Sequence, residues 1–411
     1  MTQVRELEAT VDELKHLFSE RAETGETVLL NLGPQHPSTH GVLRLMLELD
    51  GEEVINCMPD IGFLHTGIEK NMEAKTYLKA LVMTDRMDYL NNLGNNLTYC
   101  LAVEKLVGVA VPERAQVLRV ICAELQRIAS HLVWLGTSGI DLNASSMLLY
   151  CFRERERILD IFEMIAGQRM MTSYIRPGGV WRDVPAAFVP AVNDFLDYLP
   201  AKLDDYERLL TKNPLFLART KDVAILEPDY ALAIGCTGPT LRGSGVNYDV
   251  RRAMPYCGYE TYDFDVPLED GCDVYARYRV RMREFRESIK IIRQAVGRLK
   301  PGPVMTADRK VAPPPRSELS KSMEALIHHF KLWTEGFSAP DAEVYAATES
   351  PRGELGCYLV GDGGPKPRRV HFRTPSFLNL QSLPDISQGY LVADLVAAIG
   401  SIDIVLGDID R

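Results

Sequence analysis

The spacing of hydrophobic positions changes twice along the chain. Near both ends, short runs rich in β-branched and apolar residues are bounded by turn residues, which predicts strands. Three are expected in the N-terminal part, at Thr27–Leu32, Val42–Glu48 and Glu53–Met58, with Asp50-Gly51 as a hairpin turn. Three more are expected in the C-terminal part, at Val344–Ala347, Gly356–Val360 and Arg368–Phe372.

Between these regions the apolar residues recur at helical spacing. Long helical segments are expected over 68–168, 186–212 and 274–299. Breaks are expected at Gly108 with Pro112 and at Gly136 with Gly139. Shorter helices are expected at 3–19 and 391–399, and irregular segments at 175–184, 235–273 and 300–317.

This order of elements predicts an α+β fold with a central bundle of long helices between two β regions. We expect five parts: a helical extension (1–24), an N-terminal β region (25–66), a helical bundle with irregular loops (67–340), a C-terminal β region (341–387), and a C-terminal helix and tail that line a cavity (388–411).

The acidic balance of the chain excludes some partners. The formal net charge of the 411 residues is -10, which argues against binding to nucleic acid and to anionic lipid. No apolar run reaches the ~18–20 residues that span a bilayer, so any membrane association is expected to go through a partner. The acidic N-terminus resembles neither a secretory signal nor a transit peptide, and we expect a bacterial or archaeal cytoplasmic protein.

The common motifs for nucleotide and metal binding are absent. There is no P-loop, no G-x-G-x-x-G after a strand, no H-E-x-x-H and no C-x-x-C. The eight cysteines are widely spaced and mostly flanked by apolar residues, which indicates buried thiols.

Three polar segments nevertheless suggest a site. The proline-rich loop 33–41 is either a stable turn or a loop that presents His40 to a cavity. The segment 85–92 is either a helix start capped by Asp85 or a functional polar patch. Asp141, at the expected break between helices, is as compatible with a helix cap as with a functional carboxylate.

A stripe of cations is expected on one face of the helix that follows Val274. Its members recur at steps of four, three, four and three: Arg279, Arg283, Arg286, Lys290 and Arg293. The stripe is either a solvated face or a surface that meets acidic groups. Those groups would belong to a neighbouring subunit or to loops of this chain such as Glu269–Asp273.

Six segments in order resemble one known family. They are GPQHPSTHG (33–41), HTGIEK (65–70), TDRMDYLNN (84–92), TGPTLRGSG (237–245), PRGELG (351–356) and IGSIDIVLGDIDR (399–411). Together they resemble the quinone-site D subunit of bacterial respiratory complex I, the NADH:quinone oxidoreductase, from about residue 28 to the C-terminus. The resemblance implies the fold of the nickel-iron hydrogenase large subunit.

The resemblance also implies that a metal site has been lost. The two hydrogenase cysteine pairs correspond to Asp88 with Asn91 and to Val405 with Asp408. A soft thiolate cage is replaced by hard oxygen ligands and by a valine with no donor, so we expect no bound metal.

The family's quinone contacts fall on three residues of this chain. The tyrosine and histidine that bind the quinone head correspond to Tyr89 and His40, and the acid that pairs with the histidine corresponds to Asp141. Val405 is expected among the quinone-binding residues. Phenol and imidazole can donate hydrogen bonds to a quinone carbonyl, and a carboxylate can hold the imidazole tautomer.

Other implied features concern a partner that carries a tetranuclear iron–sulfur cluster. Arg86 and Met171 are expected near that cluster. This chain departs from the family pattern at Met171, where histidine is frequent, and at Thr66, where arginine is frequent. The loss of a titratable group at Met171 should alter the pH linkage of the cluster potential, and Arg86 is the candidate to supply the positive charge missing at Thr66.

The implied function is that of a core component in the peripheral arm of a proton-translocating NADH:quinone oxidoreductase, inactive alone. Quinone is the expected substrate. The expected partners are an iron–sulfur small subunit, other peripheral-arm subunits and a membrane-arm subunit at the quinone entrance. The expected location is the cytoplasmic side of the inner (plasma) membrane. Alternatives are a working hydrogenase subunit, which the missing cysteines oppose, a structural scaffold with a relic cavity, and a subunit of a ferredoxin- or deazaflavin-fed quinone reductase.

Overall fold

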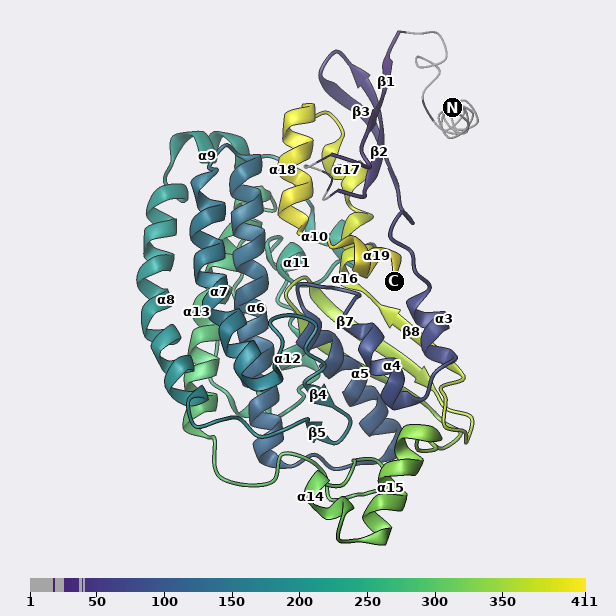
Figure 1. Ribbon diagram of the computed structural model, residues 1–411. Coiled ribbons are helices and arrows are strands. Elements are labelled where there is room, and N and C mark those ends of the chain that lie inside the picture. The colour runs from purple at the N-terminus through teal and green to yellow at the C-terminus, as the bar shows by residue number, and fades with distance from the viewer. Residues whose placement is uncertain (1–17, 19–25, 37–38, 40) are drawn as a thin grey trace.

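A computed structural model describes residues 18, 26–36, 39 and 41–411 of the chain. The helix expected over residues 3–19 lies outside the described residues except for Phe18, and so do Pro37, Ser38 and His40 in the loop 33–41. For the rest of the chain, the expected α+β class is confirmed (Figure 1).

Long helices form a bundle at the centre of the molecule. Figure 1 shows α6, α7, α8 and α13 side by side, and α6 packs against both α7 and α13. The amphipathic spacing found in the sequence explains the packing, since α8 buries Val192, Leu196, Leu199 and Leu203 on one face. The long helices are α5 (Asn92–Val107), α6 (Glu113–Asp141), α7 (Ser146–Ala166), α8 (Phe188–Leu210) and α13 (Val274–Gly297).

The break expected at Gly136 and Gly139 is wrong, because α6 continues through both glycines to Asp141. Their role is close packing. A Cβ on Gly136 would lie 3.2 Å from the Cα of Leu148, and one on Gly139 would lie 2.8 Å from the Cβ of Met147. The two glycines therefore let α7 approach α6 more closely than a side chain would allow.

Two three-stranded antiparallel sheets flank the bundle. The order is β1-β2-β3 in the first and β6-β7-β8 in the second, and the hairpin expected at Asp50-Gly51 joins β2 to β3. The expected strands are all present, with small shifts at their ends: β1 (Val28–Leu32), β2 (Arg44–Asp50), β3 (Glu53–Asp60), β6 (Glu343–Ser350), β7 (Gly353–Val360) and β8 (Arg369–Arg373). A two-residue ladder of β4 (Ile175–Arg176) and β5 (Gly179–Val180) lies in the segment expected to be irregular.

Short helices connect these layers. Helix α5 packs on β6 and β7, and α3 packs on β8. Among the described residues, six short helices precede α13: α3 (Ile68–Glu73), α4 (Tyr77–Thr84), α9 (Pro214–Thr220), α10 (Pro228–Ala233), α11 (Pro239–Arg242) and α12 (Val250–Ala253), followed by the 3-10 turn η3 (Tyr259–Thr261). Six more follow it: α14 (Arg316–Leu319), α15 (Met323–Thr334), α16 (Pro375–Leu380), α17 (Leu383–Ser387), α18 (Val392–Ile402) and α19 (Leu406–Asp410).

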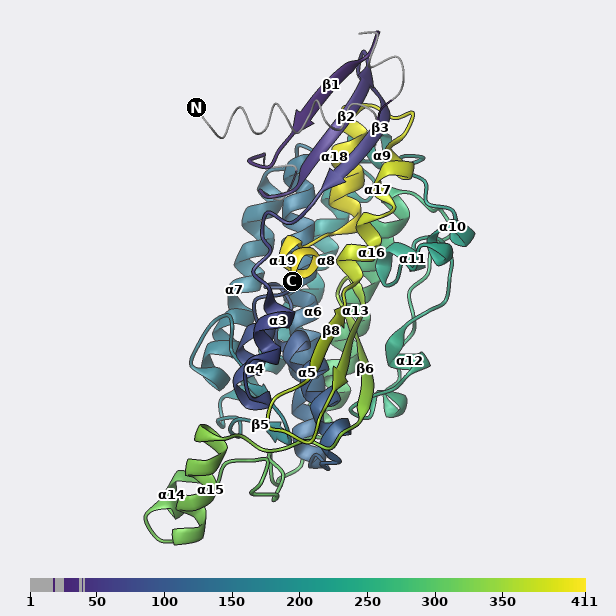
Figure 2. The ribbon, with the colours of Figure 1, turned by 90° about the vertical axis from the view of Figure 1, so that its right-hand side faces the viewer.

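A second hydrophobic core joins the two ends of the described chain. Leu45 and Leu47 of β2 belong to the same cluster as Leu395 and Ile399 of α18. Figure 2 shows the first sheet lying over α17 and α18. The backbone N–H of Val392 also donates to the carbonyl oxygen of Glu52 at 3.0 Å. The N-terminal sheet and the C-terminal tail are therefore one packing unit.

The cation stripe of α13 meets acidic groups of this chain. Each member pairs with a carboxylate: Arg279 and Arg286 with Glu207, Arg283 with Glu269, Lys290 with Asp263, and Arg293 with Asp197. The contact with Glu269 supports the alternative in which the stripe meets an acidic loop of this chain. Helix α8 supplies further acids that the sequence did not indicate. These side chains stay partly exposed, so each pair contributes little to stability.

The close contact of α6 with α7 gives a stability prediction. Gly139→Ala should lower the free energy of unfolding by about 1–3 kcal/mol, because its methyl group would overlap Met147. Denaturant unfolding of the purified chain measures this. Gly297→Ala is the matched control, since no atom lies within 4 Å of its Cβ position, and it should leave stability unchanged or raise it. Equal effects of the two variants would contradict the packing role.

Candidate functional site

The two segments in which the resemblance implies a lost metal site lie together in the structure. Segment 85–91 connects α4 to α5, and α19 packs directly on it. A methyl group on Gly407 would overlap the carbonyl oxygen of Met87 and would lie 3.4 Å from the Cδ1 of Tyr89. Glycine at position 407 therefore permits the backbone of the tail to touch the backbone beside Tyr89.

One buried arginine links these segments. Arg352 lies in the turn between β6 and β7 and is fully buried. Its Nη1 donates to the Oδ2 of Asp88 at 3.0 Å, and its Nη2 donates to the Oδ1 of Asp403 at 3.3 Å. Its Nε donates to the backbone carbonyl of Asp403 at 3.1 Å. A guanidinium can hold two carboxylates at once because its donors point in fixed directions.

A cavity of about 310 Å³ opens at this junction. Its walls come from the segment that follows Asp88, from the C-terminal half of α6, and from the tail before α19. The lining is mainly apolar with a few polar groups, as in small-molecule sites. The lining residues are Tyr89, Leu90, Val133, Trp134, Thr137, Ile140, Asp141, Arg352, Asp403, Ile404 and Val405.

Tyr89 and Val405, both expected at a quinone site, line this cavity together. Burial, and then the charge of Asp88, raise the pKa of the Tyr89 phenol above its ordinary value. The hydroxyl therefore keeps its proton at neutral pH and is available as a hydrogen-bond donor.

Asp141 lines the same cavity from the last turn of α6. The interpretation as a helix cap is wrong, because α7 begins after Ser145 and has no side-chain cap. Burial raises the pKa of the Asp141 carboxyl to about 6, and the charge of His36 opposes this shift. His36 of the loop 33–41 therefore lies close enough to Asp141 to influence its charge. His40 itself lies outside the described residues.

The interpretation of Asp85 as the cap of a helix start is also wrong. Asp85 directly follows the last residue of α4, and α5 begins only at Asn92. The buried Asp85 carboxylate instead accepts a hydrogen bond from the Ser173 hydroxyl. This bond ties the segment that carries Met171, which has a positive φ of 54°, to the residue beside Arg86. Arg86 is exposed, and its Nη1 donates to the carbonyl of Val82 at 2.9 Å.

The four positions that the resemblance assigns to metal-binding cysteines make different contacts. Asp88 is bound to Arg352, and Val405 lines the cavity. The Nδ2 of Asn91 and the Oδ1 of Asp408 are buried and have no hydrogen-bond partner among the residues that the structure describes. Burial, and then the charge of Asp88, raise the pKa of Asp408 to about 7. Across residues 26–36, 39 and 41–411, no group of three or more His, Cys, Asp or Glu side chains is arranged to hold a metal ion.

Comparison with known proteins identifies the family. The model of the family "Respiratory-chain NADH dehydrogenase, 49 Kd subunit" matches residues 141–411. The chain belongs to this family. It is 62% identical over 389 residues to the second D subunit of the NADH-quinone oxidoreductase of Chloroflexus aurantiacus, and the match covers 94% of this chain and 95% of the relative.

Other relatives are similar over nearly their full length. The second D subunit of the NADH-quinone oxidoreductase from a Roseiflexus species is 63% identical over 94% of this chain and 93% of its own. The D subunit of the NADH-quinone oxidoreductase from Thermus thermophilus is 55% identical over 98% of both chains. The resemblance inferred from the six segments is confirmed.

The candidate site contains residues that the sequence did not single out. Arg352 stands in the PRGELG segment, but a hairpin turn is normally exposed, so nothing local indicates that its side chain is buried. Trp134 and Thr137 carry no motif of their own. They lie seven and four residues before Asp141 on the same face of α6, and this spacing is the one signal that could have found them.

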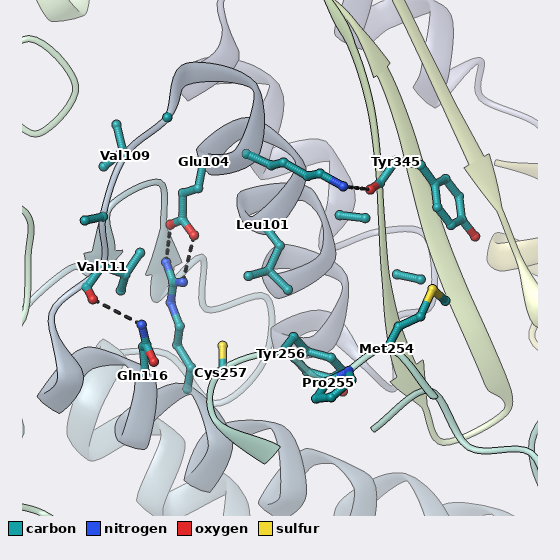
Figure 3. Close-up of a pocket in the computed structure, with 16 residues that line it drawn as sticks. Leu101, Glu104, Val109, Val111, Gln116, Met254, Pro255, Tyr256, Cys257 and Tyr345 are labelled. Carbon is teal, nitrogen blue, oxygen red and sulfur yellow. Dashed lines mark hydrogen bonds and ion pairs between the residues drawn. The ribbon is translucent and has the colours of Figure 1, made fainter. Parts of the chain in front are cut away.

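A larger cleft of about 800 Å³ lies elsewhere in this family member, between the end of α5, the start of α6 and β6 (Figure 3). The charged side chains that line this cleft are engaged by other residues of the chain. Arg119 pairs with Glu104 at 2.9 Å, and Lys105 donates to the carbonyl of Tyr345 at 3.1 Å. None of the expected site residues that the structure describes lines this cleft, so the smaller cavity at Tyr89 is the candidate site.

Two observations concern the whole described part of the chain: the state of its cysteines and the hydrophobicity of its helices. Six of the eight cysteines are buried, and none forms a disulfide among the described residues. Within that same part, none of the helices combines the length and hydrophobicity required to cross a membrane.

The raised pKa of Asp141 predicts a pH effect on stability. Because its pKa rises from 3.8 to about 6 on folding, the folded chain binds the extra proton, and stability should fall as pH rises from about 4 to about 6. Asp141→Asn should make this fall less steep, as measured by denaturant unfolding across that range. Asp194→Asn, whose side chain is 72% exposed, is the surface control. An unchanged slope in Asp141→Asn would contradict the assignment.

Proposed function

We propose that this chain is a core component of an NADH-quinone oxidoreductase and that its cavity at Tyr89 forms the quinone-reduction site together with an iron–sulfur partner subunit. Family membership supports the role in the complex. The observation that carries the site is the convergence of Tyr89, Asp141 and Val405 on one cavity, although they come from three distant parts of the chain.

The chemistry of this cavity fits a quinone head group. A quinone carbonyl only accepts hydrogen bonds until it is reduced, and then it takes up protons. The Tyr89 hydroxyl can donate to one carbonyl, His40 can donate to the other, and Asp141 can hold the histidine tautomer. The two electrons come from the partner's tetranuclear cluster, near which we place Arg86 and Met171. The lining Val405 and Ile404 provide an apolar contact for the ring.

The other subunits of the complex are the partners of this chain. They comprise an iron–sulfur small subunit at the cavity, other peripheral-arm subunits and a membrane-arm subunit at the quinone entrance. The complex lies on the cytoplasmic side of the inner (plasma) membrane. Exposed apolar side chains support such contacts, since surfaces of this kind are usually covered in assemblies. They include Ile61, Phe63 and Leu64 before α3, and Met323, Leu326, Ile327, Phe330 and Trp333 on α15.

Two alternatives make different predictions. In a scaffold with a relic cavity, changes at Tyr89 leave quinone turnover intact in an assembled complex. In a reductase that receives electrons from ferredoxin or a deazaflavin, the chemistry in the cavity is the same. Other subunits of such a complex determine the electron donor. Identification of the proteins that co-purify with this chain would distinguish an NADH-oxidising complex from a ferredoxin- or deazaflavin-fed reductase.

Removal of one hydroxyl tests the site. Tyr89→Phe should reduce quinone turnover by about fivefold or more in an assembled complex, since the ring is kept and one hydrogen bond of ~1 kcal/mol is lost. Turnover with a short-chain quinone measures the effect, and NADH oxidation with an artificial acceptor reports assembly. Tyr150→Phe, at a surface tyrosine that is 40% exposed, is the control. Unchanged quinone turnover in Tyr89→Phe would favour the scaffold.

The pairing of His40 with Asp141 is testable by a double-mutant cycle. If the two side chains are hydrogen-bonded, His40→Ala combined with Asp141→Asn should lose less quinone turnover than the two single changes added together. The same assay of the assembled complex measures all three variants. Additive losses would show that the residues act separately.

A further inference from the structure

The guanidinium of Arg352 is already engaged within the chain. Besides its bonds to Asp88 and Asp403, its Nη1 donates to the hydroxyl of Ser130. Each of its three nitrogens therefore has a partner, although the residue lies in the cavity wall. An effect of Arg352 on a molecule in the cavity must act mainly through position and charge.

The position of Arg352 determines the spacing of the cavity walls. Asp88 precedes Tyr89 in the chain, and Asp403 precedes Val405 by two residues. The guanidinium holds both acids, so it fixes the segment of Tyr89 relative to the segment of Val405. Asp403 has a positive φ of 52°, a backbone conformation that few non-glycine residues adopt. Both its carboxylate and its backbone carbonyl accept hydrogen bonds from Arg352.

We propose that Arg352 is a positioning residue for quinone reduction: it joins the Tyr89 segment to the Val405 segment and holds a positive charge beside the site where negative charge develops. This inference rests on the proposed function. Reduction of a quinone to a quinol takes up two electrons from the partner's cluster and two protons. A fixed cation near the ring lowers the cost of the charge that accumulates before the protons arrive.

The positive charge of Arg352 affects the protonation of the buried acids around it. Facing it are Asp88 and Tyr89 from the segment before α5, Arg281 from α13, and Asp403 and Asp408 from the tail. Without the guanidinium, the buried acids lose their counter-charge and would hold protons at higher pH. Lysine would keep one positive charge, but its ammonium is a single point that cannot hold two carboxylates in the fixed geometry of a guanidinium.

The experiment compares Arg352→Lys with Arg352→Met in the assembled complex. Arg352→Met should lower the maximal rate of short-chain quinone reduction on the order of ten- to a hundredfold and move the acid limb of the pH–rate profile to higher pH. Arg352→Lys should recover part of the rate and keep the pH profile of the wild type. A purely structural role would lower the amount of assembled complex without separating the two pH profiles.

Ser130→Ala is a second test in case both arginine variants fail to assemble. Ser130 is fully buried and outside the cavity lining, and it contacts the guanidinium directly. Its loss should slow quinone reduction about two- to fivefold, while NADH oxidation with an artificial acceptor is unchanged. Ser288→Ala, which removes a buried hydroxyl bonded to Glu124 away from the cavity, is the matched control.

The outcomes separate this inference from the proposed function. If Tyr89→Phe loses quinone turnover but Arg352→Met stays within about twofold of the wild type, the positioning role is wrong and the quinone site stands. Identical pH profiles of the lysine and methionine variants, or a normal rate in Ser130→Ala, would also overturn the role. If Tyr89→Phe has full activity, the proposed site itself is wrong.

Discussion

The cavity depends on one buried guanidinium. Arg352 is 264 residues from Asp88 and 51 residues from Asp403 along the chain, and it binds both. A buried ion pair costs desolvation, so it is maintained only where the geometry satisfies its donors. Here the guanidinium meets that condition, since each of its nitrogens is bonded. Removal of either acid would leave a buried charge with too few partners, and the wall between Tyr89 and Val405 would lose its anchor.

Around Arg352 the bundle interior is unusually charged. Arg242 pairs with Glu284 and Glu349, and Arg251 pairs with Asp249 and Glu124, all of them buried. Such networks do little for stability compared with apolar packing, but they penalise any rearrangement that would separate the partners. The network therefore holds these buried side chains in fixed places in the interior of the chain.

Contacts between distant parts of the chain hold the segments around the cavity together. Gly407 lets the tail touch the backbone at Met87, and Arg352 connects the acids on either side. The second core then attaches the tail to the N-terminal sheet through Leu45 and Ile399. Beside these contacts lies the cavity that Tyr89 and Val405 line.

The sequence alone determined the α+β class, the six strands, most long helices and the family, because these depend on local periodicity and on motifs that stay together in the chain. It also indicated Tyr89, Asp141 and Val405 through the resemblance. It misjudged Gly139 as a break, because local propensity cannot show that α7 packs against that face. Only the tertiary structure decided that Arg352 is buried, that α8 neutralises cations of α13, and that three distant segments enclose one cavity. Those facts follow from long-range packing and charge pairing, which no local pattern of residues encodes.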